Sequence, residues 1–457
     1  MNKELTGYPS IDKPWMKYYD CDNLQPDPKL NLVDYIKQKN VGRENHIANI
    51  YYGKKTTYRE MYKHIDNASK ALTYIGVKKG ERILFLTPNI PETGYLWLGA
   101  TQIGAVSDFV DPRPDSMDVL ANAKKILEII KFEKVSYIIA LDICYLMMIT
   151  PIESDLKSLG IETIVTLSAS DSMNIAGKID YLKNVTHYQK LRNIRLKNKV
   201  KSPMSAVIEK VKGMKKNNKL CLQAIHKSPL NVVRYKDLLK QSINTEFVTV
   251  YEENMPNYIG HTSGTSGNRP KPIVLTNENL ISGNEQLFKA NANVQVDDLV
   301  IHVLPFFSPL GANNNFLIDL ASTATLIDIP EFEPNEFGYL LKKYHPNAVM
   351  GTPAWIASLV NDVSLVDEDF SCLTRVIYGG DSMTLKDEEK VNAWLKAHKS
   401  KAVVEKGHGM SEYGGCGSYA KSEWNQYESI GIPLPDTIYT LVDSENSDEL
   451  VEVKFED

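Results

Sequence analysis

The sequence predicts an α/β protein with parallel sheets. Strand-like and helix-like segments alternate through most of its 457 residues, as expected where each strand is followed by a helix that covers the sheet. In residues 57–76 the apolar side chains recur at helical spacing, and Gly76 follows them as a stop signal. The next segments predict a buried strand at 81–89, a helix at 91–105, and strands at 135–141 and 162–167.

Composition and charge are those of a globular chain of roughly two to four domains. Hydrophobic residues make up 43% and charged residues 24%, which is enough for a large core. The net charge of −5 gives no overall signature of a nucleic-acid-binding protein, so we expect no nucleic-acid partner. Five scattered cysteines without a CxxC pair indicate reduced thiols, and the N-terminus lacks a signal-peptide core. We therefore expect a cytoplasmic protein.

Two further segments bear on the fold. The most apolar stretch, 135–150, is short for a membrane span and carries Asp142 in its middle, so a buried strand leading into a helix is the better interpretation. The short β-rich segments 438–442 and 449–455 predict a small barrel or ribbon, and the chain ends within the second of them.

Residues 183–219 form a strongly basic insertion, with twelve Lys or Arg against the single acid Glu209. A solvated surface insertion is the simplest interpretation. Apolar residues at helical spacing between Met204 and Met214 leave open an interfacial helix that contacts anionic lipid, or a basic face that meets the phosphates of a cosubstrate.

The strongest chemical signal is a run of six small residues, Thr262–Gly267, followed by Lys271. Glycines allow the backbone to approach a polyphosphate, the hydroxyls add hydrogen-bond donors, and the lysine adds a positive charge. The spacing does not fit a Walker A loop. On composition alone, a flexible Gly/Ser turn between strands remains the alternative.

Two downstream segments add candidate nucleotide contacts. In EKGHGMSEYGG (405–415), Glu412 is a candidate Mg²⁺ ligand, Ser411 a phosphate contact, and His408 a ring that stacks on a base. In LTRVIYGGDSMT (373–384), a strand ends at Gly379-Gly380, where ligands usually meet a parallel sheet. Asp381 either contacts adenine or ribose or precedes the helix that follows. A Gly-rich loop with a surface histidine is the alternative for the first segment.

The order and spacing of these segments resemble the adenylate-forming superfamily of acyl-CoA synthetases, peptide-synthetase adenylation domains and luciferases. TSGTSGNRPKP resembles the family's phosphate loop [ST]SG[ST]TGxPKG, and YGGDSM, GHGMSE and SIGIPLP are similar to its GGAPL, YGxTE and SVGxPxPG segments. LPFFSPLG (304–311) is similar to LPLFHxxG, and the GTP of 351–353 lies where the family has a turn facing the acyl pocket. The resemblance covers about residues 30–455.

The resemblance implies ATP and Mg²⁺ as cofactors and a thiol acceptor, either CoA or the phosphopantetheine of a carrier protein. It implies that these residues bind the ATP phosphates: Thr262, Ser263, Gly264, Thr265, Ser266, Gly267 and Lys271. It implies that these hold adenine and ribose: Gly379, Gly380, Asp381, Gly407, His408, Gly409, Met410 and Ser411. It places the acyl group near Phe307, Ser308, Gly311, Thr352, Pro353 and Trp355. Lys271, Glu412 and Thr265 are the expected catalytic residues, with Glu412 as the metal ligand.

For the fold, the resemblance implies two stacked helix–sheet subdomains, about 30–240 and 241–435, with contributions to a distorted β-barrel near 436–457. The implied activity is ATP-dependent conversion of a fatty or other apolar carboxylic acid to acyl-AMP, then to a thioester. Carboxylate and triphosphate repel each other, so such a site must position the reactants and neutralise charge.

The chain departs from the family pattern at four places. Asn268-Arg269 stand in place of one residue, and Pro272 replaces a glycine. Ser308 replaces a histidine that is common on the family's acyl and thiol route, a departure that bears on CoA as the acceptor. No aspartate follows Phe307, which disfavours an amino-acid substrate and a peptide-synthetase module. The sequence ends before the family's ribose-binding motif and C-terminal lysine domain. We therefore expect a piece of a longer ligase that catalyses poorly, or a degenerate nucleotide- or acyl-adenylate-binding protein.

Overall fold

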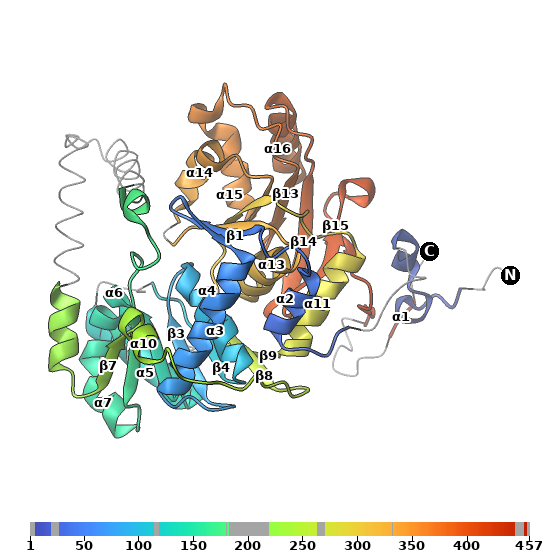
Figure 1. Cartoon of the computed structure of the whole chain (residues 1–457). Helices are drawn as coiled ribbons and strands as arrows, with labels where there is room; N and C mark the ends of the chain where they lie inside the picture. Colours follow the sequence, from blue (N-terminus) through green and yellow to red (C-terminus); the bar gives the residue numbers. More distant parts are fainter. Residues whose placement is uncertain are drawn as a thin grey trace.

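Two largely parallel sheets organise the protein (Figure 1). The computed structural model describes residues 5–19, 27–113, 118–179, 181, 219–262, 270–330, 332–443 and 452–454. The seven-stranded sheet has the order β7 (Asn231–Arg234), β6 (Thr163–Leu167), β5 (Tyr137–Leu141), β3 (Arg82–Leu86), β4 (Val106–Phe109), β8 (Pro256–Thr262), β9 (Lys271–Thr276). The nine-stranded sheet has the order β16 (Ile432–Pro433), β15 (Gly415–Ala420), β14 (Val404–Met410), β13 (Arg375–Gly379), β12 (Ala348–Gly351), β10 (Leu299–His302), β11 (Thr325–Asp328), β1 (Ile47–Tyr51), β2 (Lys54–Thr57). The α/β prediction with parallel sheets is confirmed.

The sheets exchange strands across the predicted subdomain boundary at about residue 240. Strands β1 and β2 precede that boundary but belong to the nine-stranded sheet, where β1 pairs in parallel with β11. Strands β8 and β9 follow it but belong to the seven-stranded sheet, where β8 pairs in parallel with β4. Pairing depends on which sheet edge offers free backbone groups, and the order of the segments along the chain does not fix that choice. The boundary between sheets is therefore not a single point in the sequence.

The helices cover both sheets and fill the space between them. The structure has α1 (Pro9–Asp12), α2 (Leu32–Lys39), α3 (Tyr58–Tyr74), α4 (Pro91–Gln102), α5 (Val119–Glu133), α6 (Asp142–Cys144), α7 (Glu153–Ser158), α10 (Tyr235–Gln241) and α11 (Asn277–Lys289). Further along the chain lie α12 (Pro309–Gly311), the π-helical η5 (Ala312–Leu317), α13 (Ile318–Ala321), α14 (Phe337–Tyr344), α15 (Pro353–Ser358) and α16 (Leu385–Ala397).

The early helices follow directly from local sequence signals. A reciprocal capping box between Thr57 and Glu60 begins α3, and Gly76, with a φ of 94°, follows its end. Pro91 opens α4, all of whose residues are buried. Gly99 lets α4 approach α3 closely, because a Cβ there would lie 2.8 Å from the Cβ of Ala68. The helices and strands predicted between residues 57 and 167 are confirmed.

The apolar stretch 135–150 contains β5, α6 and the π-helical η3 (Tyr145–Ile149), so the predicted strand leading into a helix is confirmed. None of the helices in the described residues combines the length and apolar character needed to cross a bilayer. Of the basic insertion 183–219, the described residues include only Lys219, so the interpretations of that insertion stay predictions.

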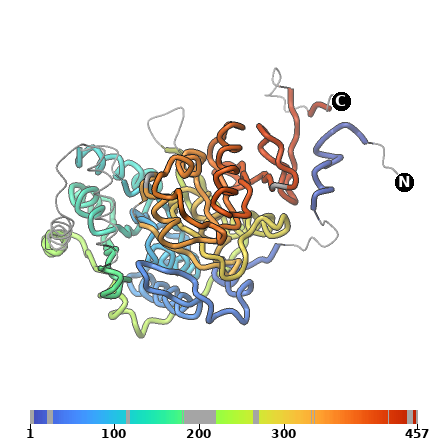
Figure 2. The backbone as a smooth tube through the Cα atoms, turned by 90° about the horizontal axis from the view of Figure 1, so that it is seen from above, coloured from blue at the N-terminus to red at the C-terminus, as the bar shows by residue number. Residues whose placement is uncertain are grey.

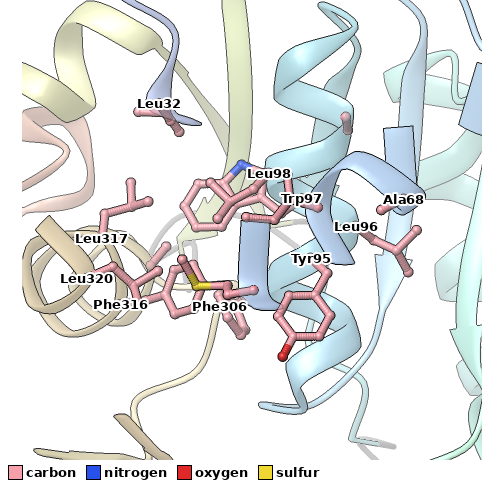
Figure 3. Packing of buried hydrophobic residues seen from close by; sticks show 14 of the residues in the cluster. Leu32, Ala68, Tyr95, Leu96, Trp97, Leu98, Phe306, Phe316, Leu317 and Leu320 are labelled. Atoms are coloured by element: carbon pink, nitrogen blue, oxygen red, sulfur yellow. The ribbon is translucent and has the colours of Figure 1, made fainter. Parts of the chain in front are cut away.

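One hydrophobic cluster joins the two sheets through the helices between them. Trp97 of α4 is fully buried and donates a hydrogen bond from Nε1 to Oδ1 of Asn257 at 3.0 Å. Its ring contacts Phe306 and Phe316, which come from the part of the chain that follows β10 (Figure 3). This shared core fixes the position of the 306–316 segment relative to the seven-stranded sheet.

The described ends of the chain meet outside this core, as the views in Figures 1 and 2 show. The Ser10 hydroxyl in α1 donates a hydrogen bond to Oε2 of Glu452 at 2.6 Å. Beyond residue 436 the described backbone contains an isolated bridge between Val442 and Glu452. The barrel near 436–457 stays a prediction.

Glu92 should make the stability of the protein depend on pH. Burial in α4 raises its pKa from 4.5 to about 7, although Ser172 donates a hydrogen bond to Oε1. Between these values the native state keeps a proton that the unfolded state loses, so the free energy of unfolding falls as pH rises towards 7. We expect the free energy of unfolding of Glu92→Gln, relative to that of the native protein, to rise by up to about 3 kcal/mol between pH 4 and pH 8. Urea denaturation of both proteins measures this difference. Glu128→Gln, at an exposed position, is the control, and equal pH dependence of both variants would contradict the assignment.

Candidate active site

The carboxyl ends of parallel strands β10, β12, β13 and β14 meet at one edge of the nine-stranded sheet. Gly379 at the end of β13 lies in register with Gly407 in β14. Gly380 follows with a φ of 82°, a conformation that favours glycine. The two glycine-containing segments predicted to contact nucleotide therefore lie side by side, as expected for ligand sites at strand ends.

A cavity of about 180 Å³ begins at these strand ends and continues along the face of the sheet. We name it the sheet cavity. Eight of the predicted site residues line it: Ser308, Gly379, Gly380, Gly407, His408, Gly409, Met410 and Ser411. Deeper in, its walls are largely apolar, with Val300, Ala348, Met350 and Ile377 on the sheet side and Ile318 on the helix side. A mouth of glycines and polar groups thus leads into a mostly apolar interior.

Two predicted catalytic residues come together at the junction of the two sheets. Lys271 begins β9 of the seven-stranded sheet, and Glu412 lies in the short helical turn η9 (Ser411–Tyr413) that follows β14. Lys271 Nζ lies 3.5 Å from Oε1 of Glu412, and both side chains are substantially exposed. Opposite charges are therefore available to a ligand next to Met410 and Ser411.

A second cavity of about 210 Å³, the side cavity, lies beyond Phe307. Thr262, at the end of β8, lines it together with Pro270 and Phe307. Its polar wall includes Arg113, whose guanidinium lies over the Phe307 ring at 5.5 Å and pairs with Asp111. Phe307 lines the side cavity and the next residue, Ser308, lines the sheet cavity, so the same segment contributes to both.

A buried acid–imidazole pair lies at the base of the predicted phosphate loop. His261 Nδ1 donates to the carbonyl oxygen of Phe109 at 2.9 Å, which leaves Nε2 as an acceptor 3.7 Å from Oδ1 of Asp108. Burial raises the pKa of Asp108 well above its usual value and lowers the pKa of His261. Burial therefore works against a charge on either group beside Thr262.

Comparison with known proteins places this geometry in a family. A model of the AMP-binding enzyme family matches residues 36–453, which is most of the chain. The chain belongs to this AMP-binding enzyme family. A long-chain-fatty-acid–CoA ligase of Bacillus subtilis is 24% identical over 449 residues, 95% of this chain and 70% of that ligase. A 4-coumarate–CoA ligase of Vanilla planifolia is 22% identical, over 86% of this chain and 60% of that ligase.

Among solved structures, the anthranilate CoA ligase AuaEII in complex with anthranoyl-AMP shares the fold. It matches with a TM-score of 0.68 and 16% identity, over 92% of this chain and 67% of that one. The AMP-binding chain described here thus spans between 60% and 70% of the length of these three proteins.

Several predicted site residues do not line the sheet cavity of this AMP-binding chain. Asp381 is exposed, its carboxylate accepts the backbone N–H of Ser382, and Thr384 rather than Asp381 caps α16. Position 311 needs a glycine for packing, because a Cβ there would lie 2.3 Å from the backbone carbonyl oxygen of Pro305. Thr352, Pro353 and Trp355 open α15, where the Trp355 ring packs on Phe332 at 4.6 Å.

The central part of the phosphate loop, Ser263–Gly267 with Thr265, lies outside the described residues, so its role stays a prediction. Its two ends are described: Thr262 pairs with Lys271 across the β8–β9 ladder. The ladder brings Lys271 to the point where the loop leaves and re-enters the sheet.

Sequence analysis missed the polar side chains on the helical wall of the sheet cavity, Asn314, Asn315 and Asp319. A signal was available, because ANNNFLIDL places four polar residues in a helix whose neighbours are apolar and buried. Such a run predicts either an exposed face or a buried site with a polar ligand.

The described residues contain no group of three or more His, Cys, Asp or Glu side chains placed to hold a metal ion by themselves. The single exposed carboxylate of Glu412 suits Mg²⁺ that arrives with nucleotide, because this ion usually takes one or two carboxylates together with phosphate oxygens and water. The donor set therefore fits Mg²⁺ bound as the ATP complex.

Proposed function

We propose that this chain binds ATP and a carboxylic acid and forms acyl-AMP, as part of an acid–thiol ligase. The observation that carries the proposal is the sheet cavity, whose mouth is built from Gly379–Gly380 and Gly407–Ser411 beside Lys271 and Glu412. The mouth offers backbone groups and both signs of charge to a nucleotide, whereas the interior offers apolar surface to an acyl chain. A site for either ligand alone would not need both features.

In the first step, a carboxylate oxygen attacks the α-phosphorus of ATP, and the bond to the β-phosphate oxygen breaks to release pyrophosphate. Two anions must approach, so positioning and charge neutralisation carry the catalysis. Lys271 places a positive charge on the phosphates, and Mg²⁺, held by Glu412, supplies further positive charge to them when bound. His408 stacks on adenine, and Gly379, Gly380 and Asp381 contact the adenosine.

In the second step, a thiol sulfur attacks the acyl carbonyl carbon, AMP leaves, and the thiol proton passes to solvent. The side cavity provides an approach to the same carbonyl, since Phe307 and Ser308, adjacent in the chain, line the side cavity and the sheet cavity respectively. Its Arg113 and Lys125 side chains suit a phosphate-bearing acceptor, either CoA or a carrier-protein phosphopantetheine.

Contact of the basic insertion 183–219 with a membrane remains a separate proposal. Its Lys and Arg side chains would attract anionic lipid. We expect deletion of 183–219 to abolish sedimentation with anionic vesicles. Equal sedimentation of both forms, or of neither, would contradict a lipid contact.

ATP–pyrophosphate exchange against a panel of carboxylic acids tests the proposed reaction. Exchange that depends on both the acid and Mg²⁺ would support the adenylation step. ATP binding without exchange for any acid would favour the alternative of a nucleotide- or acyl-adenylate-binding protein. Absence of ATP binding would contradict both.

A further inference from the structure

The two halves of the proposed site are carried by different sheets. The phosphate-loop strand β8 and Lys271 belong to the seven-stranded sheet, whereas the strands that carry Gly379 and Gly407 belong to the nine-stranded sheet. A carboxylate oxygen and the α-phosphorus react only when they are held about 3–3.5 Å apart and in line. The contacts that fix one sheet against the other therefore bear directly on this reaction.

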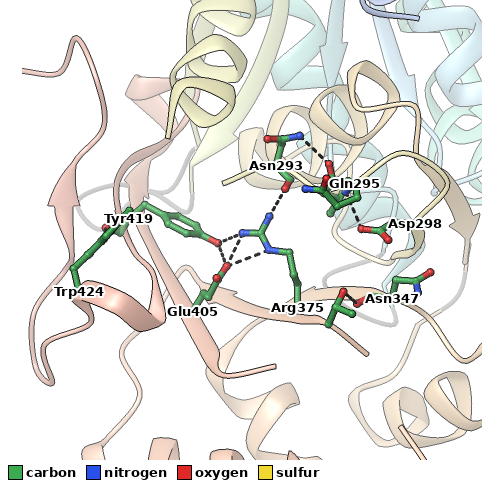
Figure 4. A network of polar contacts seen from close by, with 10 residues as sticks. Asn293, Gln295, Asp298, Asn347, Arg375, Glu405, Tyr419 and Trp424 are labelled. Carbon is green, nitrogen blue, oxygen red and sulfur yellow. Dashed lines mark hydrogen bonds and ion pairs between the residues drawn. The ribbon is translucent and has the colours of Figure 1, made fainter. Parts of the chain in front are cut away.

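Within the nine-stranded sheet, the strands on the nucleotide side are tied together by their ladders and by one guanidinium. Arg375 of β13 donates to Oε2 of Glu405 in β14 from both Nε and Nη2, and to the hydroxyl of Tyr419 in β15 at 2.8 Å (Figure 4). Its Nη1 donates to the carbonyl oxygen of Asn293, which precedes β10. These strands are therefore held as one unit, and the segment that follows β10 has to be placed against the seven-stranded sheet by other contacts.

Two side chains of the part of the chain that builds the seven-stranded sheet hold this segment, residues 303–308, by its backbone. The Tyr258 hydroxyl in β8 donates to the carbonyl oxygen of Phe306 at 2.7 Å. Asn89, between β3 and α4, donates from Nδ2 to the carbonyl oxygen of Leu304 at 2.9 Å. Both side chains are buried. Because hydrogen bonds depend steeply on distance and angle, the two bonds fix where the segment lies along β8 more narrowly than apolar packing alone would.

At the Tyr258 contact the backbone of β8 also approaches the segment. A Cβ at Gly260 would lie 2.7 Å from the Tyr258 hydroxyl oxygen and 3.1 Å from the carbonyl oxygen of Phe307, so the glycine leaves room for both. From there β8 continues for two residues to Thr262, where the predicted phosphate loop begins. On the other side of the contact, Phe307 lines the side cavity and Ser308 lines the sheet cavity. The hydroxyl thus joins the strand that leads to the phosphates to the residues beside the proposed acyl site.

We propose that Tyr258 is a positioning residue for adenylation, whose hydroxyl sets the distance between the phosphate loop and residues 306–308, and so between the α-phosphorus and the carboxylate. Tyr258 lines neither cavity, so it acts through the backbone of Phe306. Loss of the hydroxyl leaves each ligand its own contacts but loosens the placement of one ligand relative to the other. This inference rests on the proposed function, because it assumes that ATP and the acid meet beside this segment.

Tyr258→Phe separates alignment of the reactants from their binding. We expect the kcat of ATP–pyrophosphate exchange to fall about 10- to 100-fold, because a displacement of about 1 Å can cost roughly 100-fold in rate. The Kd of Mg·ATP and the KM of the acid should each change by no more than about threefold, because the lost interaction matters only when both reactants are aligned. A non-hydrolysable acyl-sulfamoyl adenosine, made from the acid with the fastest exchange, joins both halves in one molecule. Calorimetry should show that it binds about 10-fold more weakly to the variant.

Tyr58→Phe is the matched control. The Tyr58 hydroxyl is equally buried and donates to the carbonyl oxygen of Ala324 at 2.7 Å, and both residues lie outside the linings of the two cavities. Loss of this bond should lower the melting temperature, as in Tyr258→Phe, but leave kcat and the ratio of analogue affinity to Mg·ATP affinity unchanged. A purely structural role for Tyr258 predicts the same result for both variants.

Gly260→Ala is the second variant, in case Tyr258→Phe fails to fold. Its methyl group crowds the Tyr258 hydroxyl and the Phe307 carbonyl oxygen, so it should reproduce the loss of kcat. An unchanged kcat in both variants, equal losses of Mg·ATP and analogue affinity, or the same loss of kcat in Tyr58→Phe would overturn the positioning inference only. Absence of exchange with every acid in the native protein would overturn the proposed function, and this inference with it.

Discussion

Glu412→Gln should weaken binding of Mg·ATP by about 10- to 100-fold and slow pyrophosphate exchange at least as much. The substitution keeps the size of the side chain and removes the charge that fits Mg²⁺ at the mouth of the sheet cavity. Binding of ATP in the presence of EDTA should change little, because Glu412 is expected to contact the metal rather than the phosphates. Calorimetry with and without Mg²⁺ separates these two cases.

Lys271→Met provides the comparison, because it should weaken ATP binding both with and without the metal. Neither substitution should affect folding: Lys271 and Glu412 have side chains that are 68% and 41% exposed, and exposed ion pairs contribute little to stability. Thermal unfolding should therefore be nearly unchanged in both variants. Unchanged Mg·ATP affinity in Glu412→Gln would remove this residue from the site.

Local signals account for the parts of the fold that were predicted from sequence. The ends of α3 and α4 could be placed because Thr57, Glu60, Gly76 and Pro91 act within one helical turn of their own positions. The pairing of β1 with β11 could not be predicted in this way, because the two strands lie almost 280 residues apart in the sequence. Nothing local distinguishes one parallel sheet edge from another.

The candidate site divides in the same way. Gly379 was predicted because a strand that ends in glycines is readable from the sequence, whereas Gly407 was predicted through the family resemblance. The parallel pairing of β13 and β14 brings the two together. The contact between Lys271 and Glu412 depends on how the two sheets pack, which the sequence suggested only through the family resemblance. The face of a helix that lines a cavity, as for Asn314 and Asp319, depends on both walls and was missed.

Gly409→Ala should disrupt nucleotide binding more than any other single methyl group added to this strand. Gly409 lies opposite Cys416 at an irregularity between β14 and β15, and a Cβ there would lie 1.8 Å from the carbonyl oxygen of Gly415. Backbone cannot yield as a side chain can, so β14 and β15 must separate locally. Met410, Ser411 and Glu412 follow directly and would move with the strand. A displacement of about 1 Å in such a site can cost roughly 100-fold in rate, which pyrophosphate exchange would measure.

Gly407→Ala, two residues earlier on the same strand, is the matched control. Its Cβ would meet the Cys416 sulfur at 3.3 Å, a side-chain atom that can shift by a few tenths of an ångström. We therefore expect a small loss of ATP affinity for Gly407→Ala and a large one for Gly409→Ala. The melting temperature should fall only for the latter, because it alone opens the backbone pairing. Equal effects of the two substitutions would mean that the β14–β15 contact at Gly409 does not hold the loop that carries Glu412.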